Sequence, residues 1–260
     1  MKSFKIAVNY KLRKEFVDYT FNARCHKINL TPQEYMIPIS DENPTPSTPI
    51  VVYALIAVNV VVFLHQMTLG SGIEGFYQLY AVIPRQLSTS FDGVATNQPV
   101  PELLTLVTSQ FLHGGLMHIG GNMLFLWTFG DNIEHDLGHV KFLLFYLVCG
   151  VLAGLTHWFF GMQSGVPTVG ASGAIAGVMG AYLIKYPRAK IVTILPLFII
   201  WTTVRIPAVF FLGFWFVQQA FSSVASLGMP DSAGVAYWAH AGGFVFGAIL
   251  GPMLGLMSDR

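Results

Sequence analysis

The sequence is poor in charged residues. Charged side chains make up 10% of the 260 residues, whereas 53% are hydrophobic and the formal net charge is only +1. A soluble domain usually carries about 25% charged residues, and the mean hydropathy here is +0.58. This composition excludes an ordinary soluble domain and indicates a protein that crosses a membrane several times. The near-zero net charge gives no indication of a nucleic-acid partner, and we expect none.

Cysteines and metal-binding motifs are also scarce. Cys25 lies in a polar arm and Cys149 in an apolar run, so the sequence does not predict a disulfide framework. A His-Glu-x-x-His motif and a phosphate-binding loop are both absent. One polar turn contains four potential ligands, which we interpret as a solvated connection: Glu134, His135, Asp136 and His139. We therefore expect no metal and no cofactor.

The N-terminal segment shows no pattern typical of a cleavable signal peptide, and we expect none, because the first long apolar run begins only near Pro49. We expect residues 1–49 to form a cytosolic arm and linker, since they contain many lysines and arginines and end in a proline-rich stretch. An alternative is that translation starts at Met36, which opens a polar lead into the first apolar run.

Six apolar runs approach the length of about 20 residues that a helix needs to cross a bilayer. They define a membrane domain over residues 50–256. The expected spans are 50–69, 112–130, 140–160, 168–184, 207–226 and 235–256. The expected fold is thus an all-α polytopic membrane bundle of six helices.

Two connections do not fit a simple helical bundle. Residues 70–111 are longer than a turn requires, and loops of this length usually have structure or function of their own. Residues 190–205 are apolar, but Pro196 interrupts them and Arg205 ends them. We expect this second piece to be interfacial or re-entrant, with a full span as the alternative.

The distribution of basic residues predicts the orientation. Lysine and arginine cluster in the N-terminal arm and between residues 185 and 205, whereas the connections 70–111, 161–167 and 227–234 contain only Arg85. The positive-inside rule then places the N-terminus in the cytoplasm and Ser172 near the outer end of the fourth span. An arm without an Arg- and Ser-rich targeting region favours a bacterial plasma membrane over an organelle.

A serine with flanking glycines lies within the fourth apolar run. Ser172 comes between Gly170 and Gly173, a few residues after Pro167. Small residues are common where membrane helices pack, so helix packing is the simpler interpretation. Near the start of a helix, however, free backbone N–H groups and the helix dipole would favour a developing oxyanion.

A single histidine in the last apolar run could activate this serine. His240 is followed by Gly243, and glycines recur from there at intervals of four residues. A buried histidine can simply bond a neighbouring helix. Two helices with small-residue faces can, however, approach closely enough for an imidazole to take a serine proton. A serine hydroxyl needs such a base to become a nucleophile.

The second span contributes two potential hydrogen-bond donors. His118 and Asn122 are four residues apart and share one helix face. Their imidazole N–H and amide groups suit a tetrahedral oxyanion. The alternative interpretation is that they hydrogen-bond neighbouring helices.

Together these residues resemble the rhomboid family of intramembrane serine proteases. Residues 170–173 resemble the family's nucleophile motif, residues 239–243 its base motif, and His118 and Asn122 its His-x-x-x-Asn pair. The resemblance covers about residues 50–256. It implies a Ser172–His240 dyad without a third acid, a water-filled cavity open to the outer side, and transmembrane proteins in the lipid bilayer as substrates.

The chain departs from the family pattern at two places. Many relatives carry a Trp-Arg pair late in the first loop, where Leu104 and Thr105 stand here. Some carry an aromatic residue four positions after the nucleophile, where this chain has Ala176. These differences concern the anchoring of the loop and the orientation of His240, for which Tyr237 or Trp238 is a candidate substitute.

The sequence fits three functions to different extents. An intramembrane serine endopeptidase fits best. An inactive relative that acts as a scaffold for membrane helices would lack the serine or the histidine, and this chain has both. A transporter or channel would predict internal repeats or carboxylates within the membrane, which the sequence does not show convincingly.

Overall fold

The structure of the chain is a computed structural model that describes residues 37–93, 99–197, 200–227 and 236–258. Residues 36–260 form one compact unit. The expectations for the N-terminal arm, including a start at Met36, concern residues that mostly lie outside the described ranges.

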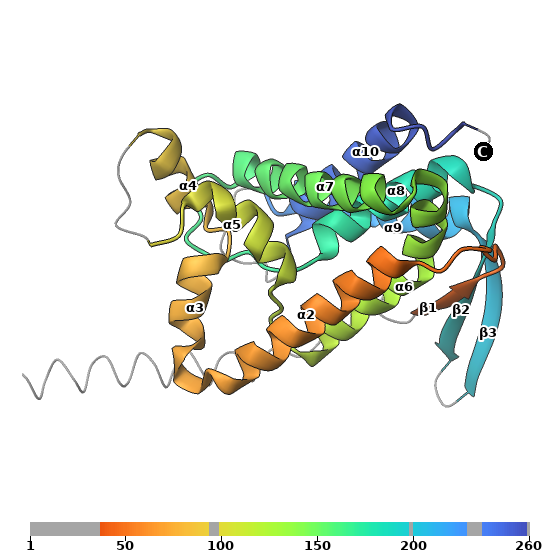
Figure 1. Cartoon of the computed structure of the whole chain (residues 1–260), viewed down its shortest axis with the longest axis horizontal. Helices are drawn as coiled ribbons and strands as arrows, with labels where there is room; N and C mark the ends of the chain where they lie inside the picture. Colours follow the sequence, from red (N-terminus) through yellow and green to blue (C-terminus); the bar gives the residue numbers. More distant parts are fainter. Residues whose placement is uncertain (1–36, 94–98, 198–199, 228–235, 259–260) are drawn as a thin grey trace, which may run out of the picture. The chain divides into compact units, whose positions relative to one another are not determined.

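The described part of the chain is mostly helical (Figure 1). Six helices lie at the places of the six expected spans. They are α2 (Ile50–Thr68), α6 (Leu116–Leu137), α7 (His139–Phe160), α8 (Ser172–Lys185), α9 (Ala208–Ala225) and α10 (Tyr237–Met253). In the described ranges, α2, α7 and α9 are long and apolar enough by themselves to cross a membrane, and α8 is a shorter apolar helix. The chain is a mostly α-helical polytopic membrane protein.

Helix α8 forms the centre of the described unit. It packs against α6, α7, α9 and α10, and its residues from Gly173 to Tyr182 are all buried. Most of these residues are small, so the surrounding helices can approach the α8 backbone closely. The first residue of α8, Ser172, therefore lies at the end of the most enclosed helix in the fold.

The first loop has secondary structure of its own. It contains η2 (Gly70–Gly72), α3 (Ile73–Tyr80), α4 (Pro84–Phe91), α5 (Glu102–Thr108) and η3 (Ser109–Phe111). Helices α4 and α5 both contact α7. A small apolar cluster joins the loop to α7; its members are Val82, Leu87, Leu106, Val151, Leu155 and Trp158.

The missing Trp-Arg pair is replaced by a different anchor. Leu104 is exposed on α5, and Thr105 is buried with its hydroxyl bonded to the Glu102 carbonyl. The anchoring tryptophan comes instead from the membrane helix, because Trp158 of α7 donates to Ser88 Oγ of α4 at 2.9 Å. Trp158 also packs against Phe91, with ring centroids 4.8 Å apart.

Residues 190–205 do not form the full helical span that the sequence left as the alternative. They form most of an antiparallel β-hairpin, β2 (Lys190–Leu197) and β3 (Ile200–Pro207), and their interfacial or re-entrant placement stays a prediction. The segment is rich in isoleucine, valine and threonine, which favour an extended backbone. Strand β1 (Ile37–Asp41) pairs with β2 and completes a sheet of order β1-β2-β3. The sheet is the one element of the described unit that the all-α expectation did not include.

The start of α2 is stabilised by a buried carboxylate from another helix. Glu134 of α6 accepts hydrogen bonds from the backbone N–H groups of Val51 and Val52 at 2.9 and 2.8 Å. Its Oε1 also lies 2.5 Å from His139 Nδ1. A carboxylate is favourable at this position because the first N–H groups of a helix have no partner within the helix. All four residues that could have suggested a metal site thus have other contacts, because His135 contacts Ser47 and Asp136 accepts a hydrogen bond from the Tyr186 hydroxyl.

Candidate active site

The chain before α8 places Ser172 as the first residue of the helix. The sequence suggested a helix from about residue 168, but α8 begins at Ser172 because Thr168 forms a β-bridge and Gly170 has a positive φ, so the helix cannot start before these residues. Thr168 and Val82 exchange two backbone hydrogen bonds, of 2.8 and 3.2 Å, and Gly170 N–H donates to Ser109 at 2.9 Å. The φ of Gly170 is +127°, a conformation that other residues rarely adopt. The first loop therefore positions the start of α8.

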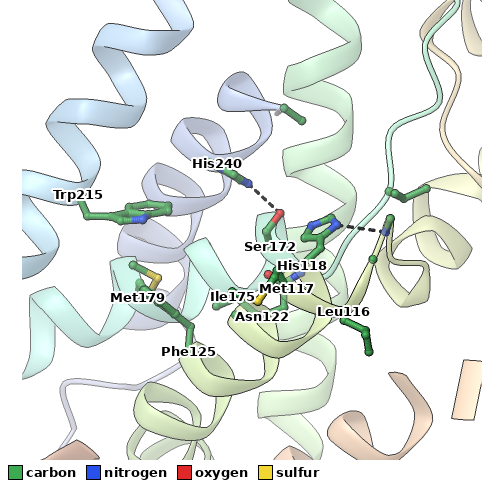
Figure 2. Close-up of a pocket in the computed structure, with 15 residues that line it drawn as sticks. Leu116, Met117, His118, Asn122, Phe125, Ser172, Ile175, Met179, Trp215 and His240 are labelled. Carbon is green, nitrogen blue, oxygen red and sulfur yellow. Dashed lines mark hydrogen bonds between the residues drawn. The ribbon is translucent and has the colours of Figure 1, made fainter. Parts of the chain in front are cut away.

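Ser172 and His240 are in direct contact. His240 Nε2 lies 2.8 Å from Ser172 Oγ (Figure 2), although the two residues are 68 positions apart in the sequence. The distance is that of a hydrogen bond through which an imidazole can take a hydroxyl proton. The first-turn N–H groups of α8 have no helical acceptor, and the Ser172 N–H is one of them.

Glycines bring α8 and α10 close enough for this contact. A Cβ atom on Gly243 would lie 2.1 Å from the Gly173 carbonyl oxygen, and one on Gly247 would lie 1.9 Å from that of Gly177. A Cβ on Gly173 would lie 2.7 Å from the Ala153 methyl group on α7. A side chain at Gly243 or Gly247 would therefore separate the helices that carry the serine and the histidine, and one at Gly173 would separate α8 from α7.

His118 and Asn122 lie on α6 at the same pocket (Figure 2). The Gly114 N–H donates to His118 Nδ1 at 3.3 Å, so a neutral His118 carries its proton on Nε2. A Cβ on Gly170 would lie 2.8 Å from this Nε2, so the absence of a side chain at Gly170 leaves room for the imidazole. Asn122 Nδ2 is buried and has no hydrogen-bond partner in the described part of the chain. Both side chains can thus present N–H groups to a ligand in the pocket.

The pocket in front of Ser172 has a volume of about 810 Å³. Its polar side chains are those of Ser172, His240, His118 and Asn122. Its lining is otherwise mostly apolar and comes chiefly from α6 and α8, including Phe125, Ile175 and Met179, with Trp215 from α9. A mostly apolar cavity with a few convergent polar groups is typical of a ligand site. No group of three or more metal-ligating side chains occurs among the residues that the structure describes.

Two residues of α9 were missed by the sequence analysis. Gln219 Oε1 lies 2.8 Å from His240 Nδ1, and the Trp215 ring lies beside the imidazole with centroids 5.8 Å apart. Trp215 thus supplies the aromatic contact that was sought at Tyr237 or Trp238, since Trp238 instead stacks on Phe160. The spacing of four residues between Trp215 and Gln219 was a signal, but nothing in the sequence specified which helix faces His240.

The part of the chain that contains the pocket residues also matches known proteins. The Rhomboid domain family matches residues 100–256. The chain is 31% identical over 145 residues to "Rhomboid protein 1, mitochondrial" of Saccharomyces cerevisiae, which covers 54% of this chain and 38% of that protein. It is 34% identical over 108 residues to "Presenilin-associated rhomboid-like protein, mitochondrial" of Homo sapiens, covering 40% and 28% of the two chains.

A plant protein shows a similar relationship. "RHOMBOID-like protein 4" of Arabidopsis thaliana is 32% identical over 149 residues, which cover 57% of this chain and 33% of that protein. The chain thus matches less than two fifths of the length of these curated relatives. Their mitochondrial and plant origins lend no support to the bacterial plasma membrane that the N-terminal arm favoured. The family match covers more than half of the sequence, and the chain belongs to the rhomboid family, a family of the intramembrane-protease type.

Proposed function

We propose that the chain is an intramembrane serine endopeptidase in which Ser172 is the nucleophile and His240 is the general base. The observation that carries this proposal is the 2.8 Å contact between Ser172 Oγ and His240 Nε2 at an apolar pocket. A hydroxyl alone is a weak nucleophile, and an imidazole within hydrogen-bond distance removes that limitation.

In the proposed reaction, His240 Nε2 takes the Ser172 proton while Oγ attacks the carbonyl carbon of the scissile peptide bond. The carbonyl oxygen becomes an oxyanion, which accepts hydrogen bonds from the Ser172 backbone N–H, His118 Nε2–H and Asn122 Nδ2–H. As the tetrahedral intermediate collapses, the C–N bond breaks and the imidazolium gives its proton to the leaving amine. This leaves an acyl ester on Ser172.

Water completes the cycle. His240 takes a proton from a water molecule, whose oxygen attacks the ester carbonyl, and the same donors stabilise the second oxyanion. The C–Oγ bond then breaks, Ser172 regains its proton from His240, and a carboxylic acid leaves. The proposed steps use only groups of the protein, the substrate and one water molecule, and we propose no metal or cofactor.

The apolar lining of the pocket supports a membrane-embedded substrate. Leu116 and Met117 at the start of α6 are largely exposed and line the pocket. An apolar segment of a substrate can therefore pack against these two side chains without burying a polar group. We propose that the substrates are transmembrane segments of other proteins in the same bilayer.

The test is cleavage of a single-span substrate by the purified chain in detergent, together with labelling by a fluorophosphonate. Wild type should cleave and become labelled at Ser172, whereas Ser172→Ala and His240→Ala should do neither while keeping the wild-type unfolding temperature. Cleavage by Ser172→Ala would exclude the serine mechanism. A folded wild type that neither cleaves nor labels would favour a scaffold for membrane helices instead.

A further inference from the structure

Gln219 is a buried polar residue on a mostly apolar helix. It lies in the fourth turn of α9 and its side chain is only 5% exposed. Burying an amide is costly unless it is hydrogen-bonded. Its Oε1 lies 2.8 Å from His240 Nδ1, on the side of the imidazole away from Ser172. The position of this amide therefore calls for an explanation beyond packing.

The contact determines which nitrogen of His240 carries the proton. An amide oxygen can only accept a hydrogen bond, so Nδ1 must donate and a neutral His240 carries its proton on Nδ1. Nε2 then has a free lone pair facing Ser172 Oγ–H. The opposite tautomer would place an N–H against the serine hydroxyl and leave no acceptor for its proton. The correct tautomer is a requirement for this chemistry, as the loss of activity in chymotrypsin-type enzymes with the wrong tautomer shows.

No carboxylate takes this role among the described residues. The Nδ1 partner is a neutral amide, and the other ionisable side chains close enough to influence the imidazole are His118 and His157. A neutral acceptor orients the ring without adding a negative charge. It therefore fixes the tautomer but gives the imidazolium less stabilisation than an aspartate would.

Trp215 restricts the same ring from the same helix. Trp215 and Gln219 are four residues apart and so share one face of α9. The ring centroids of the indole and the imidazole are 5.8 Å apart, and the angle between the ring planes is 36°. Ser223 Oγ donates to the backbone carbonyl oxygen of Gln219 at 2.8 Å. Helix α9 thus contacts both the face of the ring and its Nδ1.

We propose that Gln219 is a positioning residue, whose Oε1 accepts the Nδ1–H of His240 and keeps Nε2 available for the Ser172 proton. This role rests on the proposed protease function. It makes the site a functional trio of serine, histidine and glutamine, with the third residue supplied by α9.

The test compares three variants of the full chain in detergent. Gln219→Met keeps the length of the side chain but removes the acceptor. It should lower kcat and the rate of fluorophosphonate labelling by about 10- to 100-fold, with KM changed less than about twofold. Gln218→Met makes the same change at the neighbouring position, which points about 100° away around the axis of α9, and should label at the wild-type rate.

Gln219→Glu tests whether Gln219 acts on the protonation of His240, because a purely structural role would leave the pH–rate profile unchanged. It keeps an acceptor and adds a negative charge, which favours the imidazolium. The acidic limb of the pH–rate profile should therefore move to higher pH by about one unit or more, while activity above that limb is retained. If Gln219→Met fails to fold, this variant decides, and an unmoved acidic limb would overturn the proposal.

The tautomer itself can be observed by ¹⁵N NMR of histidine-labelled protein, with His240→Gln used to assign the signal. Wild type should show the proton on Nδ1, and Gln219→Met should lose this preference. A proton on Nε2 in active wild type, or wild-type labelling by Gln219→Met, would overturn the positioning role alone. A folded wild type that neither cleaves nor labels would instead refute the protease itself, and the role of Gln219 with it.

Discussion

Trp158 Nε1 donates a hydrogen bond to Ser88 Oγ at 2.9 Å and so joins α7 of the membrane bundle to α4 of the first loop. The same loop contributes Val82, which pairs with Thr168 shortly before the candidate nucleophile. This bond is thus connected to Ser172 through the loop. Loop anchoring and the geometry of the site are linked in this chain.

We expect Trp158→Phe to destabilise the loop more than the bundle. Phenylalanine keeps most of the ring contact with Phe91 but removes the N–H donor, at a cost of about 0.5–1.5 kcal/mol. Limited proteolysis should cut within residues 70–111 faster than in wild type, and the labelling rate of Ser172 should fall by a few fold. Trp127→Phe on the exposed face of α6 is the matched control. Equal proteolysis of Trp158→Phe and wild type would contradict this anchor.

The close approach of α8 and α10 predicts a severe effect of one methyl group. In Gly247→Ala the new Cβ would lie 1.9 Å from the Gly177 carbonyl oxygen, so the backbones must move apart. We expect a loss of about 3 kcal/mol in unfolding free energy, read as a lower unfolding temperature in detergent, together with loss of fluorophosphonate labelling.

Gly213→Ala is the control for this substitution. Gly213 also lies inside a membrane helix, α9, but a Cβ there would meet no atom within 4 Å. Its unfolding temperature should be unchanged or slightly higher, because alanine favours a helix more than glycine does. A Gly247→Ala protein that behaves like Gly213→Ala would show that the two backbones are not in contact.

Much of the fold followed from patterns that depend on sequence alone. Helical spans need long apolar runs, so the approximate places of the six helices were visible. The residues proposed to react were visible for a related reason, since Ser172, His240, His118 and Asn122 are polar groups within apolar runs. The structure brings all four to one pocket.

The hairpin of β2 and β3 could not be recognised by hydropathy, because an apolar strand and an apolar helix of similar length have the same composition of hydrophobic residues. The β-branched residues between Ile191 and Ile206 were the available signal. Its pairing with β1 joins segments about 150 residues apart, and no local pattern encodes such a pairing.

The contacts of α9 with His240 were hidden for a different reason. Gln219 and Trp215 gain their roles only from the rotation of α9 about its axis and from its place next to α10. That arrangement results from packing of the whole bundle. The family resemblance directed attention to Ala176, whereas this chain places its aromatic group on another helix.

The stability of the described unit should depend on pH through Asp41. This carboxyl group lies on β1, outside the membrane helices, and accepts hydrogen bonds from Tyr182 and Asn132. Burial, with a smaller contribution from Asp131, raises the pKa of Asp41 to about 6. The folded state therefore favours the protonated form. Its stabilising contribution is complete below the unfolded pKa of about 4, and is lost as the pH rises through the folded pKa of about 6.

The measurement is the unfolding temperature of wild type and Asp41→Asn between these two pH values. Wild type should lose stability relative to Asp41→Asn as the pH rises, because asparagine stays neutral. Asp92→Asn, at an exposed position after α4, controls for the loss of one negative charge. Parallel curves for wild type and Asp41→Asn would show that Asp41 titrates at its ordinary value.

Asn122 should matter for the reaction and not for the fold. Its Nδ2 is buried at the pocket and has no partner among the described residues, so removing it breaks no hydrogen bond of the resting protein. In Asn122→Ala we expect kcat for a single-span substrate to fall about 10²- to 10³-fold, as for other oxyanion donors. KM should change little, because the oxyanion exists only after the attack by Ser172.

The matched control is Gln163→Ala, which removes an exposed amide from the connection between α7 and α8. Both variants should keep the wild-type unfolding temperature within a few degrees, and only Asn122→Ala should lose turnover. Unchanged kcat in Asn122→Ala would mean that only His118 and the Ser172 backbone N–H donate hydrogen bonds to the oxyanion. A marked fall in unfolding temperature would instead assign Asn122 to helix packing, because a donor reserved for the transition state contributes nothing to the stability of the free protein.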